Sequence, residues 1–430
     1  MIRHLLATVS LSCVFIAPAL AAREIPIADP SQFASAAAAT QPGEVLVLAA
    51  GEWKDARLKL KATGTAKLPV VVRAQTPGAT IFTGDSRISI SGAHITVEGL
   101  HFKNPTGEEV IELRTKSDAL ATDCRVTQCA VTNELPGSKS EGSARFVSIY
   151  GARNRIDHCL IQGKTSAGTT VVVWLSDEAK DQGHHRIDHN YFGPRERLGK
   201  NGGETIRLGD SKISMQRAEC VVENNVFERC DGEAECISNK SCGNLYQHNT
   251  FLSVAGTITL RHGNDCTVQN NVFLGRGVKG TGGIRVIGER NRVIGNHLEG
   301  LRGTEERSAI CFMLGIPDSP ANGYFQVKDA VIERNTIVDC TSPMVIGVKG
   351  EKKASLPPVG VRITGNSVVA PNVTAIDARC DITSIRWADN TMEAKSLGIP
   401  PTPGITEGPT HSTKPDQVTS REEVGPGWWK

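Results

Sequence analysis

Four hexapeptides decide the fold of this chain: VENNVF at residues 222–227, YQHNTF at 246–251, VQNNVF at 268–273 and VIGNHL at 293–298. Each has an apolar or aromatic residue, two variable residues, an asparagine, one further residue and a second apolar residue. The same pattern recurs at IDHNYF (187–192), IERNTI (332–337), ITGNSV (363–368) and WADNTM (387–392). Self-similarity at a period of roughly 20 to 50 residues indicates a repeat architecture.

The spacing of the repeated asparagines predicts a stack of short coils. Successive asparagines lie between 22 residues (Asn249 to Asn271) and 39 residues (Asn296 to Asn335) apart. Units this short cannot bury an apolar face alone, so they must pack on one another. We therefore predict an all-β fold, a single-stranded right-handed parallel β-helix, with the asparagines stacked inside as a ladder of amides. Leucine-rich repeats would need a leucine spacing that is absent, and propeller blades are longer.

The ends of this repeat region differ from its centre. Earlier copies of the motif replace the asparagine, and we assign Cys129, Cys159 and Gly99 to its position. Before the first strands, a short helix is expected over residues 31–40, capped by Asp29 or Ser31, at one end of the stack.

Composition and cysteine content narrow the class of protein. The chain has 430 residues with 48 Lys+Arg and 46 Asp+Glu, a balance that predicts no overall field for nucleic acid or a membrane. An acidic polymer would have to be bound by locally arranged cations. A chain of this length does not need a disulfide framework, so we expect most cysteines to be small buried residues, with one or two disulfides.

The two termini are expected to lie outside the repeat domain. Residues 1–21 have a basic start, an apolar run and a small-x-small site, the pattern of a cleavable signal peptide, which predicts a periplasmic or secreted protein. The repeat domain is then assigned to residues 22–399. Residues 400–430 are rich in proline, threonine and glycine and predict a surface tail, with Trp428 and Trp429 against the last coil.

Chemistry-bearing residues concentrate in NGGETIRLG (201–209), GEAECISNKS (232–241) and TITLRHGN (257–264). Glu233 and Glu235 point to one face of an extended segment, and paired carboxylates are tolerable around a hard cation such as Ca²⁺, to which Asn201 could add an oxygen. Lys240, Arg261 and Arg285 precede the ladder positions by nine, ten and eleven residues. That spacing predicts a column of three cations on successive coils, suited to an anionic polymer.

Each of these features has a plainer interpretation. A lone E-x-E is usually a solvated strand face, and the ladder asparagines are expected to be scaffold. GRGVKG at 275–280 matches a dinucleotide-binding pattern but has no helix after it, and the histidines around His184 and His185 occupy turn positions rather than metal-ligand spacing. The long interval between Asn296 and Asn335 predicts an excursion that could form a wall of a groove.

The motifs NGGETIRLG, GEAECISNKS, TLRHGN and GGIRVIG, with ISISGAHITVEGLHF at 88–102, resemble polysaccharide lyase family six, the family of chondroitinase B and alginate lyases. The resemblance covers about residues 24–395. It implies cleavage of uronate-containing polysaccharides by β-elimination. It also implies a Ca²⁺ site at Asn201, Glu233 and Glu235, a base at Lys240, an acid at Arg261, and substrate contacts from His262 and Arg285.

Several functions compete at this point. The first is an alginate lyase, because alginate is a bare uronate polymer and no extra basic cluster for sulfate is visible; the second is a chondroitin or dermatan sulfate lyase. A β-helical glycoside hydrolase would use Glu233 and Glu235 as its carboxylate pair. A non-catalytic glycan-binding protein would have little reason to gather these groups in one place. The oligomeric state cannot be deduced from these patterns.

Overall fold

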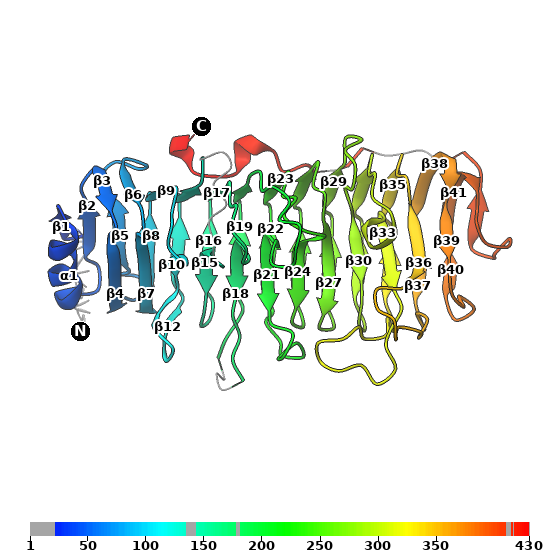
Figure 1. Ribbon diagram of the computed structural model, residues 1–430, viewed down its shortest axis with the longest axis horizontal. Helices are drawn as coiled ribbons and strands as arrows, with labels where there is room; N and C mark the ends of the chain where they lie inside the picture. The colour runs from blue at the N-terminus through cyan, green and yellow to red at the C-terminus, as the bar shows by residue number, and fades with distance from the viewer. Residues whose placement is uncertain (1–21, 135–142, 178–180, 410–413, 416, 430) are drawn as a thin grey trace, which may run out of the picture.

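The computed structural model describes residues 22–134, 143–177, 181–409, 414–415 and 417–429, so the signal peptide expected at residues 1–21 lies outside the described part. Within it the chain forms an elongated body of three long sheets (Figure 1). Each coil gives one strand to each sheet, and coils stack by parallel pairing in register, as in Val222, Tyr246, Val268 and Val293. The predicted parallel β-helix is confirmed.

Sheet 1 contains β1 (Glu24–Ile27), β2 (Val45–Leu48), β5 (Val70–Ala74), β8 (Ile95–Glu98), β13 (Arg125–Thr127), β16 (Arg155–Asp157), β19 (Arg186–Asp188), β22 (Val221–Glu223), β25 (Leu245–Gln247), β28 (Thr267–Gln269), β31 (Arg292–Ile294), β34 (Val331–Glu333), β37 (Arg362–Thr364) and β40 (Arg386–Ala388). Sheet 2 contains β4 (Arg57–Thr63), β7 (Arg87–Ala93), β10 (Glu109–Glu112), β11 (Arg114–Lys116), β12 (Ala119–Thr122), β15 (Arg145–Ile149), β18 (Val171–Val173), β21 (Ile206–Gly209), β24 (Glu235–Lys240), β27 (Thr257–His262), β30 (Ile284–Val286), β33 (Ile310–Met313), β36 (Met344–Val348) and β39 (Ile376–Ala378). Sheet 3 contains β3 (Gly51–Lys54), β6 (Thr80–Thr83), β9 (His101–Lys103), β14 (Ala130–Thr132), β17 (Leu160–Gln162), β20 (Tyr191–Phe192), β23 (Val226–Glu228), β26 (Thr250–Leu252), β29 (Val272–Leu274), β32 (His297–Glu299), β35 (Thr336–Val338), β38 (Ser367–Thr374), β41 (Asn390–Ser396) and β42 (Ile405–Glu407).

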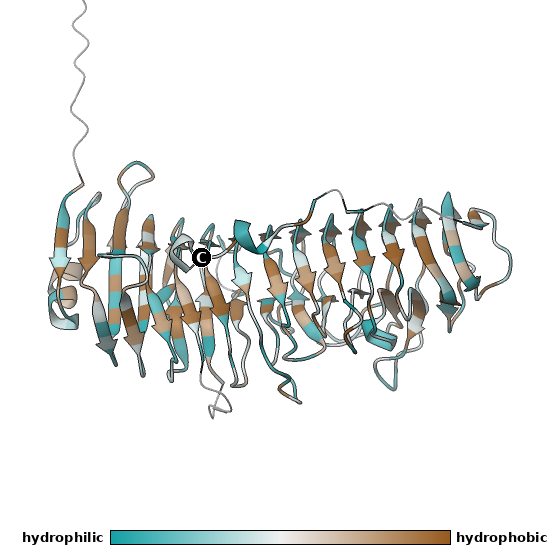
Figure 2. Ribbon diagram, turned by 90° about the horizontal axis from the view of Figure 1, so that it is seen from above, coloured by the Kyte–Doolittle hydropathy of each residue, from teal (hydrophilic) through white to brown (hydrophobic). Residues whose placement is uncertain are grey.

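The core is a column of stacked apolar side chains inside the coils, and brown segments recur along the strands in Figure 2. Phe192, Phe227, Phe251 and Phe273 stack at centroid distances of 4.8, 4.7 and 4.5 Å. Identical side chains can stack in this way because parallel strands lie about 4.8 Å apart. The repeat pattern therefore specifies the register as well as the fold.

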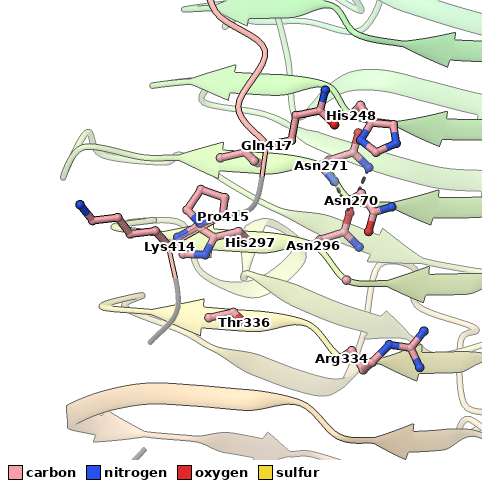
Figure 3. A pocket seen from close by; sticks show the side chains of 12 residues that line it. His248, Asn270, Asn271, Asn296, His297, Arg334, Thr336, Lys414, Pro415 and Gln417 are labelled. Carbon is pink, nitrogen blue, oxygen red and sulfur yellow. Dashed lines mark hydrogen bonds between the residues drawn. The ribbon is translucent and has the colours of Figure 1, made fainter. Parts of the chain in front are cut away.

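The asparagine ladder runs between sheets 1 and 3. From Asn190 to Asn366 each backbone N–H donates to the Oδ1 of the next ladder asparagine, ending at Asn390, at 2.9–3.1 Å. Figure 3 shows this contact between Asn271 and Asn296, whose side chains also bond at 3.0 Å. The amides satisfy buried backbone groups at a bend that no strand partner reaches.

The residue before each ladder position has a positive φ, for example 52° at Asn270 and 54° at Gln128. This register corrects one assignment. Gly99, at φ 72°, belongs to the left-handed position, and Leu100 occupies the ladder position because its carbonyl accepts from Ala130 N–H. Glycine suits the left-handed position, where it carries no steric cost.

Replacing one ladder asparagine should destabilise the whole stack. Asn271→Ala leaves the N–H of Asn249 and the carbonyls of Tyr246 and Gln269 without their partners, so we expect a loss of about 2–3 kcal/mol of stability. Urea unfolding would measure it. The matched control is Asn270→Gly, at the exposed neighbouring position with positive φ, and an equal loss in both variants would contradict the ladder's role.

The N-terminal helix is confirmed with a shift of one residue: α1 spans Pro30–Ala39. Asp29 is its cap, because its carboxylate accepts from the backbone N–H groups of Ser31 and Gln32. In the described part, no helix is long and apolar enough to cross a bilayer. Three 3₁₀ turns complete the elements, η1 (Glu305–Arg307), η2 (Arg421–Glu423) and η3 (Gly427–Trp429).

The cysteine prediction is half right. Ten of the eleven described cysteines are buried, as expected, but all eleven are free thiols, so the one or two expected disulfides are absent from this part of the chain. Many of the thiols contact backbone carbonyls of their own or the preceding coil, as Cys159 does with Val126 and Asp157. They act as small core residues in successive coils.

The tail differs from expectation in two ways. The boundary at residue 400 falls inside the last coil, because β42 still pairs with β41. The tail then runs back along the body, along the upper edge in Figure 1. Thr419 bonds the carbonyl of His248, Gly425 that of His189, and Trp428 that of Gln128. Trp428 and Trp429 therefore anchor the tail on early coils, where Trp428 lies against Gly78, and not on the last coil.

A hollow of about 400 Å³ lies under the tail, between Lys414 and the bend that carries Asn271 (Figure 3). His248, His297 and Arg334 line it. It holds none of the residues singled out for catalysis, and its histidines, His248 and His297, directly precede and follow ladder asparagines.

Candidate functional site

Sheet 2 carries the polar cluster on its outer face. Residues on successive coils follow one another in register, so Arg207 of β21 is opposite Ser238 of β24, Ser238 is opposite Thr259 of β27, and Thr259 is opposite Arg285 of β30. A parallel column two residues further along contains Gly209 and Lys240. The site is therefore built from four adjacent coils.

Two irregularities in the pairing of β24 with β27 lie at Glu235 and at Lys240. Bulges of this kind re-aim side chains and are common beside active sites. Because of the second bulge, Lys240 is opposite His262 rather than Arg261. The three cations do lie on successive coils, as predicted. They do not form one column, because Arg285 is opposite Thr259, two residues away from the column that contains Lys240.

Lys240 is half-buried and has no ionic partner within 4.0 Å among the described residues. The nearby carboxylate of Glu235 is instead directed to arginines, with Oε1 3.5 Å from Arg285 and 3.9 Å from Arg261. Of the three cations Lys240, Arg261 and Arg285, only Lys240 has no ionic partner in the described structure. Its amine is therefore left for a ligand.

Arg261 is held from several sides. Its Nη1 donates to the carbonyl of Gly323 at 3.0 Å, its guanidinium lies 4.0 Å from the ring centre of Tyr324, and Nη2 is 3.9 Å from Glu351. Burial is the main cause that lowers the pKa of Arg261 from its ordinary value. The guanidinium is therefore fixed in place.

Arg285 is 5% exposed and extends across the same face. Its Nη2 donates to the hydroxyl of Tyr324 at 2.7 Å, and its Nη1 reaches Glu235. Tyr324 comes from the excursion between β33 and β34, which leaves the body at the lower edge of Figure 1. Ser214 also donates to the carbonyl of Ala321 in this excursion at 3.0 Å, so the predicted excursion lies beside the cluster.

His262 is only 1% exposed. Its Nε2 lies 3.2 Å from Ser211 Oγ, and its Nδ1 faces Arg261 Nη1 at 3.5 Å. Burial, followed by the charges of Arg261 and Lys240, lowers the pKa of His262 to about 3, so the ring is neutral at ordinary pH. This geometry fits a residue that orients Arg261 better than one that holds a polymer directly.

Asn201, Glu233 and Glu235 line one open hollow of about 380 Å³, together with Arg197 and Arg307. Glu233 precedes β24 and lies outside any strand, so the shared orientation comes from the turn and not from an extended segment as predicted. Its Oε2 accepts from the N–H groups of Gly202 and Gly203 at 3.0 and 3.2 Å, which attaches it to the segment that carries Asn201.

The donor set fits a hard cation. Burial, then the nearby carboxylate of Glu204, raises the pKa of Glu233 to about 7, with Glu235 adding to the effect. Carboxylates that disfavour one another's ionisation are relieved by a bound divalent ion. Carboxylate and amide oxygens are also the ligands that Ca²⁺ prefers. Asn201, Glu233 and Glu235 would hold such an ion.

Two residues of this site were missed from the sequence. Tyr324 joins Arg261 and Arg285, but lies 63 and 39 residues away from them in an irregular excursion, and no local pattern marks it. Arg207 lies inside the NGGETIRLG motif, one coil before Ser238. It lies 18 residues before the next ladder position, Asn225, and not nine to eleven as the other cations do, so the same counting does not place it in the cluster.

Comparison with known proteins shows which family and fold this chain resembles. The family model of chondroitinase B matches residues 27–407. The solved structure of the PL6 family alginate lyase AlyGC has 37% identity and a TM-score of 0.89 over 95% of this chain, which spans 59% of the length of that protein. A mannuronic acid specific family 6 lyase from human gut microbiota has 28% identity and a TM-score of 0.80, over 94% of this chain and 96% of the other.

A third structure, the PL6 family lyase Pedsa3628 from Pseudopedobacter saltans, shares the fold at 22% identity and a TM-score of 0.76, over 94% of this chain and 99% of the other. No curated protein sequence matches the chain. The family model covers most of the chain, and the first of these structures shares more than a third of its aligned residues. The chain belongs to polysaccharide lyase family 6, the family of chondroitinase B.

Proposed function

We propose that the protein cleaves alginate by β-elimination, with calcium as its cofactor. The observation that carries the proposal is the outer face of β24, β27 and β30, where an unpaired lysine stands beside two fixed arginines and a carboxylate hollow. A uronate polymer carries a carboxylate on every sugar. The lysine and the two arginines can pair with such carboxylates. Family membership supports an acidic polysaccharide as substrate.

Lys240 is the proposed base. Elimination removes the proton on C5 of a uronate, and the electrons of that C–H bond form a double bond to C4 while the bond from C4 to the glycosidic oxygen breaks. A lysine can accept the proton only as the neutral amine. Among the described residues no carboxylate pairs with the Lys240 amine, so the amine is left for the substrate.

Arg261 is proposed to act on the departing oxygen. That oxygen leaves with the bonding electrons and must gain a proton. Arg261 is held by Gly323, Tyr324 and His262, so it is fixed where charge develops and loses little freedom in the reaction. It neutralises the charge that develops on the oxygen, and the proton is returned to that oxygen by Lys240 or by a water. Arg285 and Tyr324 hold the substrate beside it.

The proposed metal site has one task in this scheme. Calcium held by Asn201, Glu233 and Glu235 would neutralise the carboxylate on C5 and so make the neighbouring proton more acidic. The residues themselves bind and orient: Glu233 is tied to Gly202 and Gly203, and Glu235 to Ser238 and the two arginines.

Alginate is the substrate we favour, because the solved structures with 37% and 28% identity are an alginate lyase and a mannuronic acid specific lyase. Dermatan sulfate is the second candidate, since the matching family model is that of chondroitinase B. We further propose that the chain acts in the periplasm or outside the cell, on the strength of the signal-like residues 1–21.

The test is a substrate panel with the full chain. Mannuronate blocks, guluronate blocks and dermatan sulfate are incubated with the protein and calcium, and ultraviolet absorbance of unsaturated uronate is followed. We expect release of unsaturated product from at least one alginate block and a rate on dermatan sulfate lower by about tenfold or more. Unsaturated product from dermatan sulfate alone would reverse the assignment, and no unsaturated product from any polymer would refute it.

A further inference from the structure

Arg195 lies in the connection between β20 and β21 and is only 4% exposed. Burial lowers the pKa of its guanidinium to about 10, so the group is charged at neutral pH. A buried charge is costly unless its hydrogen bonds are made. The guanidinium makes five, all to uncharged oxygens: Nη1 donates to the hydroxyl of Thr170 at 2.9 Å and the carbonyl of Glu204 at 2.5 Å, and Nη2 donates to the carbonyls of Ser166, Gly168 and Gly202 at 3.2, 2.9 and 3.1 Å.

The main chain of Arg195 is bonded to the next coil, at the turn that leads into Glu233. Arg195 pairs in parallel with Cys230, and its carbonyl accepts from the N–H of Asp231 at 2.9 Å. The side chain of the same residue reaches Gly202, which directly follows Asn201. Arg195 therefore contacts both of the turns that carry the proposed calcium ligands Asn201 and Glu233.

A single peptide group connects the guanidinium to the Glu233 carboxylate. The carbonyl of Gly202 and the N–H of Gly203 belong to the same peptide. Arg195 Nη2 donates to that carbonyl at 3.1 Å, and that N–H donates to Glu233 Oε2 at 3.2 Å. Hydrogen bonds in such a chain polarise one another, so a cation on the carbonyl strengthens the N–H as a donor. Arg195 thus orients Glu233 through one peptide, without contacting the carboxylate.

The two turns approach each other so closely beside Arg195 that neither has room for a side chain. A Cβ on Gly232 would lie 2.1 Å from the carbonyl oxygen of Gly203 and 3.0 Å from Arg195 Nε. A Cβ on Gly203 would lie 2.4 Å from the carbonyl oxygen of Gly232. Glycine permits this kind of backbone contact. The distance between the two turns is therefore set by backbone contact and by the guanidinium that bonds one of them.

We infer that Arg195 is a positioning residue for the calcium site: it holds the Gly202–Gly203 peptide so that Asn201 and Glu233 are presented to one ion. The inference rests on the proposed function, because it assigns a role to a residue behind the same metal site. Arg195 does not line the hollow that Asn201 and Glu233 share. Its effect on the ion is therefore through the two turns.

The sign of the effect separates positioning from simple charge. A cation close to a metal site repels the ion, so removing the charge alone would tighten calcium binding. Loss of an oriented ligand weakens binding instead. Residues that orient metal ligands through hydrogen bonds typically contribute about 10- to 100-fold to metal affinity. For Arg195→Met, which keeps an unbranched side chain but removes every donor, we expect calcium affinity to fall by about that factor.

Titration calorimetry of calcium with the full chain measures this, and urea unfolding shows that each variant is folded. Arg195→Lys is the second variant, used if Arg195→Met does not fold. It keeps the charge, but one nitrogen cannot replace both Nη1 and Nη2, so calcium affinity should still fall about tenfold. In either variant, the calcium concentration for half-maximal cleavage should rise by the same factor as the dissociation constant, with kcat retained at saturating calcium.

The matched control is Lys164→Met. Lys164 is 2% exposed and donates three bonds of 2.7 Å, to the carbonyl and hydroxyl of Ser166 and to the carbonyl of Ala167, so its loss also removes buried bonds but none to Gly202. This variant should bind calcium as the parent does. Unchanged or tighter calcium binding in a folded Arg195 variant, or an equal loss in Lys164→Met, would overturn the inference while leaving the metal site standing. A parent chain that binds no calcium would refute the proposed metal site, and the inference with it.

Discussion

Lys240→Ala is expected to reduce kcat for eliminative cleavage by a factor of about 10²–10⁴, the usual contribution of a positioned base. The side chain lies on the outer face of β24 and makes no ion pair in the described structure, so its removal leaves the core intact. Binding should be nearly retained, because Arg285, Tyr324 and Arg261 hold the substrate without it. KM should therefore change much less than kcat.

Steady-state kinetics on alginate polymer, with circular dichroism as a check of folding, would measure this effect. The matched control is Lys212→Ala, which removes an exposed lysine from the connection after β21 and should keep full activity. If Lys240→Ala retained more than a few per cent of the parent rate, the base would have to be another group. The neutral ring of His262 would be the next candidate.

Removal of calcium is expected to have the second largest effect, a loss of at least about 100-fold in activity that added calcium restores. Glu233→Gln should reproduce it. A glutamine oxygen can still accept from Gly202 and Gly203, so the turn is preserved while one negative charge of the proposed donor set is lost. Any loss then reports on the charge and not on the local fold.

Calcium binding can be measured apart from activity. Titration calorimetry of the parent chain should show a calcium site, and Glu233→Gln should weaken it about tenfold or more. Glu196→Gln, an exposed carboxylate on the connection after β20, is the matched control and should bind calcium as the parent does. Full activity after exhaustive chelation, or equal calcium affinity in both variants, would contradict a metal site at Asn201, Glu233 and Glu235.

Much of the fold could be predicted because the residues that stack on one another in the structure recur at regular intervals in the sequence. Asparagines that recur at one bend and phenylalanines that recur two residues later, such as Asn271 and Phe273, specify both the coil and its register. The same counting placed Lys240 and Arg261 on adjacent coils. It did not reveal the bulge that sets Lys240 opposite His262, because an extra residue in a strand leaves the spacing between ladder positions plausible.

Residues in irregular segments could not be placed by counting from the ladder positions, because these segments contain no repeat. Tyr324 enters the site from an excursion of unrepeated sequence, and Trp428 reaches Gly78 through a tail whose path depends on packing alone. The cysteines show a different limit. Export suggests disulfides, whereas stacking in register places the thiols in core positions, where many of them contact backbone carbonyls.

The central claim is that this site breaks a glycosidic bond by elimination, without adding water. Cleavage of alginate in water enriched in heavy oxygen, followed by mass spectrometry of the oligomers, tests it most directly. The account predicts products that carry an unsaturated uronate at the new end and no heavy oxygen from bond cleavage. Saturated products, each pair carrying one heavy oxygen, would show hydrolysis by a carboxylate pair such as Glu233 and Glu235 and would contradict the account.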